Sequence, residues 1–322
     1  MLLSRVADNL YWGARYVERA EDTARIVRSY TEVIIDLPTS VTSSWEPLLA
    51  IAGSREPFDA GHARADEGSI VRFLVAAPDF GGSIVSTVAK ARENLRTTRE
   101  ILPREAWQAV NDLFLYTGSN GESGVDRRSR ARFLGRVITD VQHIDGILSS
   151  SMSRDEAYEL WRLGQALERA DMTTRVVGVR AAALMHRDVA ADPIADGAPA
   201  AEADSFEHVQ WMGVLRSLSA LQMYQRATHG PIEAASVVRF LLHDARFPRS
   251  VAGCAGRAHL ALSRLPHAER LLPCVEAVEA TIAEVRVDVE DGPALDASMD
   301  RVQATLAHLN DEILDAFVNV SG

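Results

Sequence analysis

An aromatic residue, a glutamate and an arginine follow one another at intervals of seven in two distant parts of this chain. The two sets are Tyr11, Glu18 and Arg25, and then Trp161, Glu168 and Arg175. An interval of seven brings side chains to the same side of an α-helix, so each set predicts a polar stripe. A carboxylate and a guanidinium on one stripe can bind a small charged ligand, transfer a proton or form an ion pair. Because the aromatic residue recurs with the charges, we expect a buried or cleft-lining stripe, not a solvated face.

The stripes belong to two copies of one segment, residues 10–27 and 160–177. The copies align without a gap and are identical at seven positions of the first copy, Leu10, Glu18, Arg19, Ala20, Thr23, Arg25 and Val27. Their separation is far longer than the period of a solenoid repeat, so we interpret them as a duplicated structural element. Small and apolar residues at the same interval predict a long amphipathic helix that a neighbour can approach closely. We expect the two helices to cross at a pseudo-twofold axis in the middle of a bundle.

Four further residues are candidates for ligand binding. Arg15 and Asp22 lie in the first copy, while Asp244 and Arg249 lie on either side of Pro248. Proline favours the first turn of a helix, so Pro248 predicts that Arg249 lies where free N–H groups and the helix dipole attract anions. The alternative is a structural corner held by an ion pair between Asp244 and Arg249.

The residues alone leave three roles open. In a binding site, Arg25, Arg175 and Arg249 would grip a carboxylate or phosphate, and the stripe glutamates would orient them or hold an amine. In an enzyme that modifies peptides or amides, Glu18 or Glu168 would be the acid or base, with one pKa raised by burial and the other lowered by arginines. In a structural role, Glu18–Arg25 and Glu168–Arg175 would be buried ion pairs that fix the helix crossing. No nucleophile is placed beside the carboxylates, which favours a non-catalytic role.

The composition narrows the class of protein. The chain has 322 residues, of which 47% are hydrophobic, and this is enough for a substantial core. A net charge of −11 argues against general binding of nucleic acid, which depends on many basic side chains. The sequence has neither an apolar run long enough to span a membrane nor a secretory signal peptide. We therefore expect a soluble cytoplasmic protein without a nucleic-acid or membrane partner.

The patterns that usually mark a metal or cofactor site are missing from the sequence. No glycine-rich phosphate loop occurs, and Cys254 and Cys274 are too few and too far apart for a zinc site. A di-iron bundle needs inward-facing Glu-x-x-His pairs, and the nearest match, Asp140 with His143, stands alone. We expect no cofactor and no metal.

Helical periodicity extends along almost the whole chain, and no segment alternates with the period of a strand. The expected helices span about 4–36, 44–52, 67–76, 83–102, 103–116, 126–150, 153–186, 205–227, 231–244, 248–265, 267–287 and 294–319. We expect loops at 55–67 and 117–124 and a mobile internal loop at 188–204. The predicted fold is all-α. It is one domain over 1–322, a large bundle of roughly ten to twelve helices with two long pseudo-equivalent helices at its centre.

With these motifs the chain resembles the bacterial alpha-E family over its full length. The resemblance rests on Leu3–Ala7, Leu10–Trp12, Arg15–Tyr16, Glu18–Arg25, Ala91–Asn94, Leu167–Asp171, Phe240–Leu242, Asp244 and Phe247–Ser250. His243 and Leu95 depart from the pattern, which usually has leucine and alanine at these positions. The resemblance implies an all-helical protein named for its motif glutamate.

The resemblance also implies partners. Members of the family accompany, or are fused to, a circularly permuted ATP-grasp amidoligase and a transglutaminase-like peptidase. Such systems resemble machinery that makes or trims a small peptide or an amide-linked conjugate, so a peptide or amino acid is the implied ligand. The resemblance supplies this context and no mechanism. We expect a helical accessory or substrate-binding partner of the ligase. The alternatives are a stand-alone peptide- or amide-modifying enzyme and a purely structural interaction scaffold.

Overall fold

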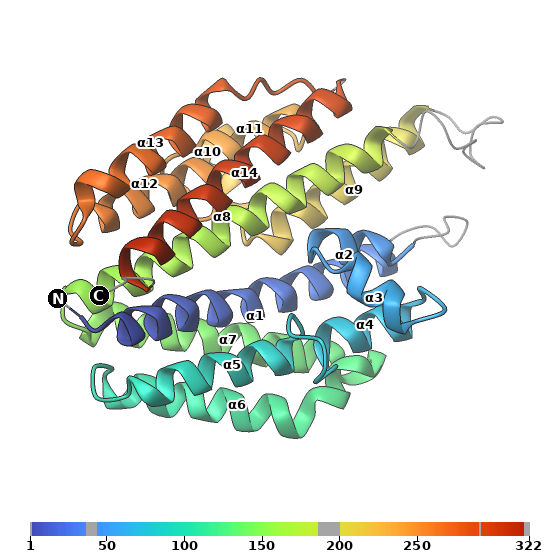
Figure 1. Ribbon diagram of the computed structural model, residues 1–322. Helices are drawn as coiled ribbons and strands as arrows, with labels where there is room; N and C mark the ends of the chain where they lie inside the picture. The colour runs from blue at the N-terminus through green and yellow to red at the C-terminus, as the bar shows by residue number, and fades with distance from the viewer. Residues whose placement is uncertain (1, 37–43, 186–199, 290, 319–322) are drawn as a thin grey trace.

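The computed structural model is a bundle of α-helices built around two long ones (Figure 1). It describes residues 2–36, 44–185, 200–289 and 291–318, and within these ranges it contains fourteen helices and no strand. The helices are α1 (Ser4–Asp36), α2 (Glu46–Ile51), α3 (Arg55–Gly61), α4 (Glu67–Val75), α5 (Ile84–Thr97), α6 (Arg104–Val125), α7 (Arg127–Ser151), α8 (Glu156–Met185), α9 (Ala200–Ser217), α10 (Leu221–Thr228), α11 (Ala234–His243), α12 (Val251–Leu262), α13 (Ala268–Glu284) and α14 (Gly292–Phe317). The predicted all-α bundle with two long central helices, α1 and α8, is confirmed.

Each long helix is the centre of one half of the bundle. Helix α1 packs against α5 and α7, which α6 covers, whereas α8 packs against α12 and α14, which α13 covers. Figure 1 shows the first group, α1 to α7, below most of the second group, α8 to α14. The halves meet mainly where α1 packs against α8, and α9 adds a further contact with α1. The duplicated segments therefore form the junction between the two halves.

Short polar residues set the start of several helices around this junction. Asp66, Ser83, Asp126, Ser250 and Asp291 each precede a helix, and each side chain accepts a hydrogen bond from the backbone N–H three residues on. Such N-caps satisfy N–H groups that have no partner inside the helix, and each typically stabilises the fold by about 1 kcal/mol. The boundaries of the helices that surround α1 and α8 are thus fixed locally by the sequence.

Small residues bring α1 and α8 close together. Ala14 and Gly164 are equivalent positions of the two copies, and a Cβ atom added to Gly164 would lie 3.2 Å from Cβ of Ala14. The same added atom would overlap the carbonyl oxygen of Tyr11. Two equivalent positions that face each other are what a pseudo-twofold axis produces. The structure therefore contains the crossing that the duplication predicts.

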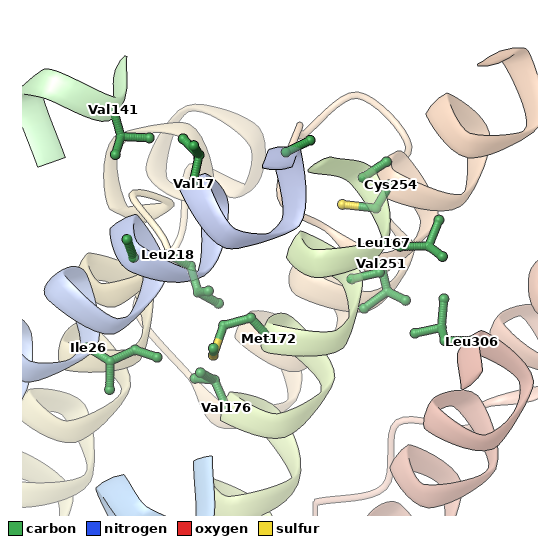
Figure 2. Packing of buried hydrophobic residues seen from close by; sticks show 14 of the residues in the cluster. Val17, Ile26, Val141, Leu167, Met172, Val176, Leu218, Val251, Cys254 and Leu306 are labelled. Atoms are coloured by element: carbon green, nitrogen blue, oxygen red, sulfur yellow. The ribbon is translucent and has the colours of Figure 1, made fainter. Parts of the chain in front are cut away.

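Apolar side chains fill the space around the crossing (Figure 2). Val17 and Ile26 of α1 and Met172 of α8 are buried, and Val251 of α12 and Leu306 of α14 are buried on the other side of α8. They belong to one continuous apolar cluster that reaches into both halves. Because the core is continuous, the charged side chains of α1 and α8 are enclosed by it where they meet.

The close approach at Gly164 gives a first prediction. Gly164→Ala is expected to lower the free energy of unfolding by about 1–3 kcal/mol, because the added methyl group meets backbone that cannot move aside. Alanine inside a helix is otherwise about 1 kcal/mol more favourable than glycine. Gly146→Ala in α7 is the matched control, since no atom lies within 4 Å of its added Cβ and it should stabilise the protein. Urea unfolding of both variants makes the comparison, and equal stabilisation would contradict the close crossing.

The expected loop at 117–124 is wrong, because α6 runs unbroken through it. Glycine lowers helix propensity, but here the glycines allow close packing that outweighs the loss. A Cβ added to Gly124 would lie 2.6 Å from a ring carbon of Phe133, and one added to Gly121 would lie 3.1 Å from a methyl group of Val85. Gly121 and Gly124 thus mark contacts with neighbouring helices, whereas a Cβ added to Gly118 would meet no atom within 4 Å.

Two further differences explain why the structure has more helices than expected. Helix α3 lies inside the expected loop at 55–67, and the single helix expected at 205–227 is divided into α9 and α10. The division falls at Ser219, whose φ of 53° is in the left-handed region and interrupts a right-handed helix.

The expected mobile loop at 188–204 falls mostly outside the described residues, which omit 186–199. Its last residues are helical, because α9 begins at Ala200. The organisation of 1–322 as a single domain stays a prediction.

Candidate functional site

The two Glu-Arg pairs of the duplicated segment exchange partners across the crossing. Arg19 donates from Nε to Oε1 of Glu168 at 2.5 Å and from Nη2 to Oε2 at 3.0 Å. In the opposite direction, Arg169 donates from Nε to Oε1 of Glu18 at 2.7 Å. Each glutamate therefore binds the arginine that follows the other glutamate in the sequence. A pseudo-twofold axis between α1 and α8 produces this reciprocal pairing.

The predicted ion pairs between residues seven apart are wrong. Arg25 instead donates to Glu21 Oε1 from Nε at 2.9 Å and from Nη2 at 2.5 Å. Arg175 donates from Nε to Oδ2 of Asp171 at 2.9 Å. Seven residues correspond to a rise of about 10.5 Å along a helix, whereas residues four apart are neighbours on its surface. Residues seven apart do share one helix face, but Arg25 and Arg175 each bind a carboxylate four residues earlier in the same helix.

Glu168 is the centre of the first charged group. Besides Arg19, it accepts a hydrogen bond from Nε of Arg15 at 2.8 Å, and its side chain is only 2% exposed. Burial raises the pKa of Glu168, but the charges and hydrogen bonds of Arg19 and Arg15 more than offset this and hold the pKa below its usual value. Glu168 is thus an ionised carboxylate between two arginines.

Residues of α1 and α14 complete the surroundings of Glu168. Arg15 Nη1 and the hydroxyl group of Tyr11 both donate to Oδ1 of Asn310 on α14, at 2.6 and 2.8 Å. The guanidinium of Arg15 also lies 5.1 Å from the ring centre of Trp12, a cation–π distance. Tyr11 is 1% exposed, so it anchors α1 to α14 inside the bundle. The predicted ligand residues Tyr11 and Arg15 are therefore held by protein groups.

Trp161 is the counterpart of Tyr11 in the second copy, and it is also 1% exposed. Its indole Nε1 has no hydrogen-bond partner among the described residues. A buried donor without a partner costs about 1–3 kcal/mol, so Trp161 contributes through packing and not through its polar atom. The aromatic position of the stripe is thus part of the core in both copies.

Glu18 is the centre of the second charged group. Its Oε1 is bound by Arg169, and Nη2 of Arg249 lies 2.8 Å from the same oxygen. Burial raises the pKa of Glu18, but Arg169 and Arg249 outweigh it and lower the pKa to about 2. A carboxyl group with this pKa stays ionised at neutral pH and is a poor proton donor or acceptor there.

Arg249 brings three carboxyl groups of α1 together. Its Nη2 donates to Oε2 of Glu21 at 2.8 Å and its Nη1 donates to Oδ1 of Asp22 at 2.6 Å, in addition to the contact with Glu18. The Arg249 side chain is 9% exposed. It is therefore a buried cation that holds the segment before α12 against α1.

Asp22 differs electrostatically from its neighbours. Its burial, opposed by Arg249 but reinforced by the charges of Glu18 and Glu21, raises the pKa of Asp22 to about 8. Its Oδ2 has no hydrogen-bond partner among the described residues, and the same is true of Oε2 of Glu18. With this pKa, Asp22 is mostly protonated at neutral pH, beside the ionised carboxylate of Glu18.

Two predictions about the proline corner are wrong. Helix α12 begins at Val251 with Ser250 as its N-cap, so Arg249 lies before the helix and not in its first turn. Asp244 makes no pair with Arg249, because its Oδ1 accepts hydrogen bonds from the N–H groups of Arg246 and of the next residue. The Thr173 hydroxyl donates to the carbonyl oxygen of Arg249 at 2.8 Å, and this fixes the corner to α8.

The predicted site residues do not converge on one cavity. Glu18, Glu168 and Arg249 lie in the buried network at the crossing, and Asp244 lies in its turn. Arg175 is 32% exposed and lies beside Gly53, so close that a Cβ added to this glycine would be 2.7 Å from its Nη1. Arg25 lines a cavity of about 370 Å³ beside α9 and α10.

Several residues of the network were not among the predicted ligand residues. They are Arg19, Glu21, Arg169 and Asn310. The sequence did contain a signal for Arg19 and Arg169, because both copies have the same arginine directly after the motif glutamate. Asn310 lies in a helix outside the duplication, and no sequence pattern connects it to Tyr11.

Neither a metal site nor a membrane span is found in the described parts of the chain. Within residues 2–36, 44–185, 200–289 and 291–318, no three His, Cys, Asp or Glu side chains are grouped so as to hold a metal ion. In the same residues, no helix combines the length and apolar character needed to cross a bilayer.

Comparison with known sequences places this geometry in a family. Residues 2–318 match the sequence model of Alpha-E, described as a predicted alpha-helical domain with a conserved ER motif. Uncharacterized proteins of Mycobacterium bovis and Mycobacterium tuberculosis are 24% identical over 288 residues, an alignment that covers 81% of this chain and 30% of each relative. The chain thus spans less than a third of the length of these relatives. No solved structure matches the chain.

Proposed function

This chain belongs to the Alpha-E family, and we propose that it is a helical accessory protein that binds a substrate for a circularly permuted ATP-grasp amidoligase. It acts in the cytoplasm on a small peptide or amide conjugate, with a peptide or amino acid as ligand. A transglutaminase-like peptidase is a further partner. The Glu-Arg network at the crossing is the frame of this protein and not its reaction centre.

The burial of both motif glutamates, and their pairing with arginines of the other copy, is the observation that most supports a non-catalytic network. Glu18 and Glu168 are 0% and 2% exposed, and each is bound by an arginine from the other copy. A general acid or base must reach a substrate proton, directly or through one water, and needs a pKa near the working pH. Glu18, with a pKa of about 2, has neither property. The network therefore supports an organising role more strongly than the stand-alone enzyme.

The same burial supports a structural role for the network in particular. Opposite charges that meet only in one register define how α1 and α8 cross, and misaligned helices would leave them buried and unpaired. The longer relatives support a partner role, because there a matching helical unit is part of a chain about three times its length. A rigid helical frame of this kind can present a ligand to a second protein.

Co-elution tests the partnership directly. The chain and its accompanying ATP-grasp ligase should elute together in size-exclusion chromatography, with or without ATP, magnesium ions and peptide. We also expect Glu18→Gln, where it stays folded, to keep product formation by the complex within about threefold, because Glu18 transfers no proton.

The outcomes separate the interpretations. A general acid or base contributes about 10²- to 10⁴-fold to the rate, so a loss of that size in folded Glu18→Gln would establish the catalytic alternative instead. Failure of the two proteins to associate under every ligand condition would overturn the partnership.

A further inference from the structure

A basic cavity lies between the C-terminal part of α1 and the α9–α10 corner. Its volume is about 370 Å³, within the range of small-molecule sites. Arg25, Arg28 and Glu32 line it from α1, and Arg216 and Ser219 line it from the corner. Among the described residues, its lining thus includes three guanidinium groups and one carboxylate. In a chain with a net charge of −11, this is a local reversal of charge.

Arg25 is held in place with donors to spare. Nε and Nη2 donate to Glu21, and Nη1 donates to the hydroxyl group of Ser219. A guanidinium has five N–H groups, so two of those on Arg25 make no hydrogen bond to the described residues and remain for a ligand. The Arg25 side chain is 10% exposed, which means that it is fixed by the protein before a ligand arrives. A fixed guanidinium loses little conformational entropy on binding.

Arg28 adds a weakly paired charge to the cavity, and Ser219 adds a strained backbone conformation. Arg28 is 45% exposed, and it forms an ion pair at 3.1 Å with Glu32 on the same face of α1. Such exposed pairs contribute little to stability, so a ligand can replace this one at little cost. Ser219 has a φ of 53°, an unfavourable conformation for a residue with a side chain. Strained backbone of this type often lies at binding sites, where the surrounding structure maintains it.

We propose that this cavity binds the oxyanion group of a small ligand, a carboxylate or a phosphoryl group, through Arg25, Arg28 and Arg216. The planar fork of a guanidinium matches the oxygens of either group, and Ser219 places a hydroxyl group beside it. The inference deepens the proposed function, because it gives the substrate an anionic end and a location on this chain.

Isothermal titration calorimetry of the isolated chain tests the site with inorganic phosphate and with acetate, at constant ionic strength. We expect one saturable site with a dissociation constant of about 1 mM or tighter for at least one probe. Arg28→Gln and Arg216→Gln should each weaken binding about tenfold. Glu32→Gln should tighten it several-fold, because it removes a carboxylate that lines the cavity and pairs with Arg28. A loss of stability alone would not increase affinity.

Arg72→Gln is the matched control, since Arg72 is 53% exposed, pairs with Glu122 and does not line the cavity. It should bind both probes like the unmodified chain. Saturation with phosphate alone identifies a phosphoryl site, and saturation with acetate identifies a carboxylate site. Binding that is absent for both probes, or unchanged in Arg28→Gln and Arg216→Gln, overturns the proposal. Because no ligase is present, anion binding without co-elution would refute only the partnership, and co-elution without anion binding would refute only this site.

Discussion

Glu168→Ala is expected to lower the free energy of unfolding by about 3–5 kcal/mol. The substitution leaves Arg15 and Arg19 without the carboxylate that both of them bind, and their side chains are only 11% and 29% exposed. The loss comes mainly from the uncompensated buried charge and only partly from the attraction itself. Urea unfolding monitored by circular dichroism gives the value. In a protein of ordinary stability, such a loss is a large part of the total.

Glu93→Ala is the control for this experiment. Glu93 pairs with Arg96 at 2.7 Å, but both side chains are about half exposed, so the change should cost no more than about 1 kcal/mol. If Glu168→Ala does not fold, the combination of Glu168→Gln with Arg19→Gln removes one charge of each sign. It should be more stable than the two separate losses added together predict. A cost for Glu168→Ala as small as that for Glu93→Ala would refute the buried frame.

The central part of the fold was predictable because the duplicated segments contain the residues that form the helix crossing. Residues 10–27 and 160–177 contain both the small residues that permit the crossing and the charges that meet there. Helical periodicity then identified most of the other helices. The glycines of 117–124 predict a loop, but the segment is helical, because glycine occurs both in flexible loops and where helices pack closely, and the neighbouring helices decide between the two.

The arrangement of the site was less predictable, because partner choice depends on tertiary structure. The sequence shows that Glu18 and Glu168 lie on polar helix faces, but many arginines are within reach of such a face. A pseudo-twofold axis makes Arg169 the partner of Glu18, and this pairing follows only when the two helices are placed together. Arg249 reaches Glu18 from a segment outside the duplication, so no internal repeat could identify it.

The ion pairs also connect the basic cavity with the crossing. Glu21 accepts hydrogen bonds from Arg25 at the cavity and from Arg249 in the buried network, and Arg249 contacts Glu18. Glu18 is bound in turn by Arg169 of α8. An anion on the remaining donors of Arg25 would add negative charge beside Glu21, which Arg249 also binds. The frame and the proposed binding site are therefore parts of one electrostatic system.

Within that system, Asp22 gives the second large effect, a dependence of stability on pH. Its pKa is about 8 in the folded protein, against a reference value of 3.8, so between these values the folded state binds the extra proton. Stability must then fall as pH rises, by about 1.4 kcal/mol per pH unit from this residue alone. Asp22→Asn mimics the protonated side chain and removes this dependence. Its stability relative to the unmodified chain should increase steadily from pH 5 to pH 8 and then level off.

Urea unfolding at pH 5, 6, 7, 8 and 9 measures this difference, and Asp79→Asn, an exposed position in a turn, is the control that should follow the unmodified chain. The titration of Glu18 does not affect this comparison between pH 5 and pH 9. Its folded pKa of about 2 is lowered, so its stabilising contribution is complete above about pH 5 and is lost only in stronger acid. If the profile of Asp22→Asn runs parallel to that of the unmodified chain, Asp22 is ionised in the folded protein. The three carboxyl groups around Arg249 would then all be charged, and the neighbouring Arg169 and Arg25 would have to balance them.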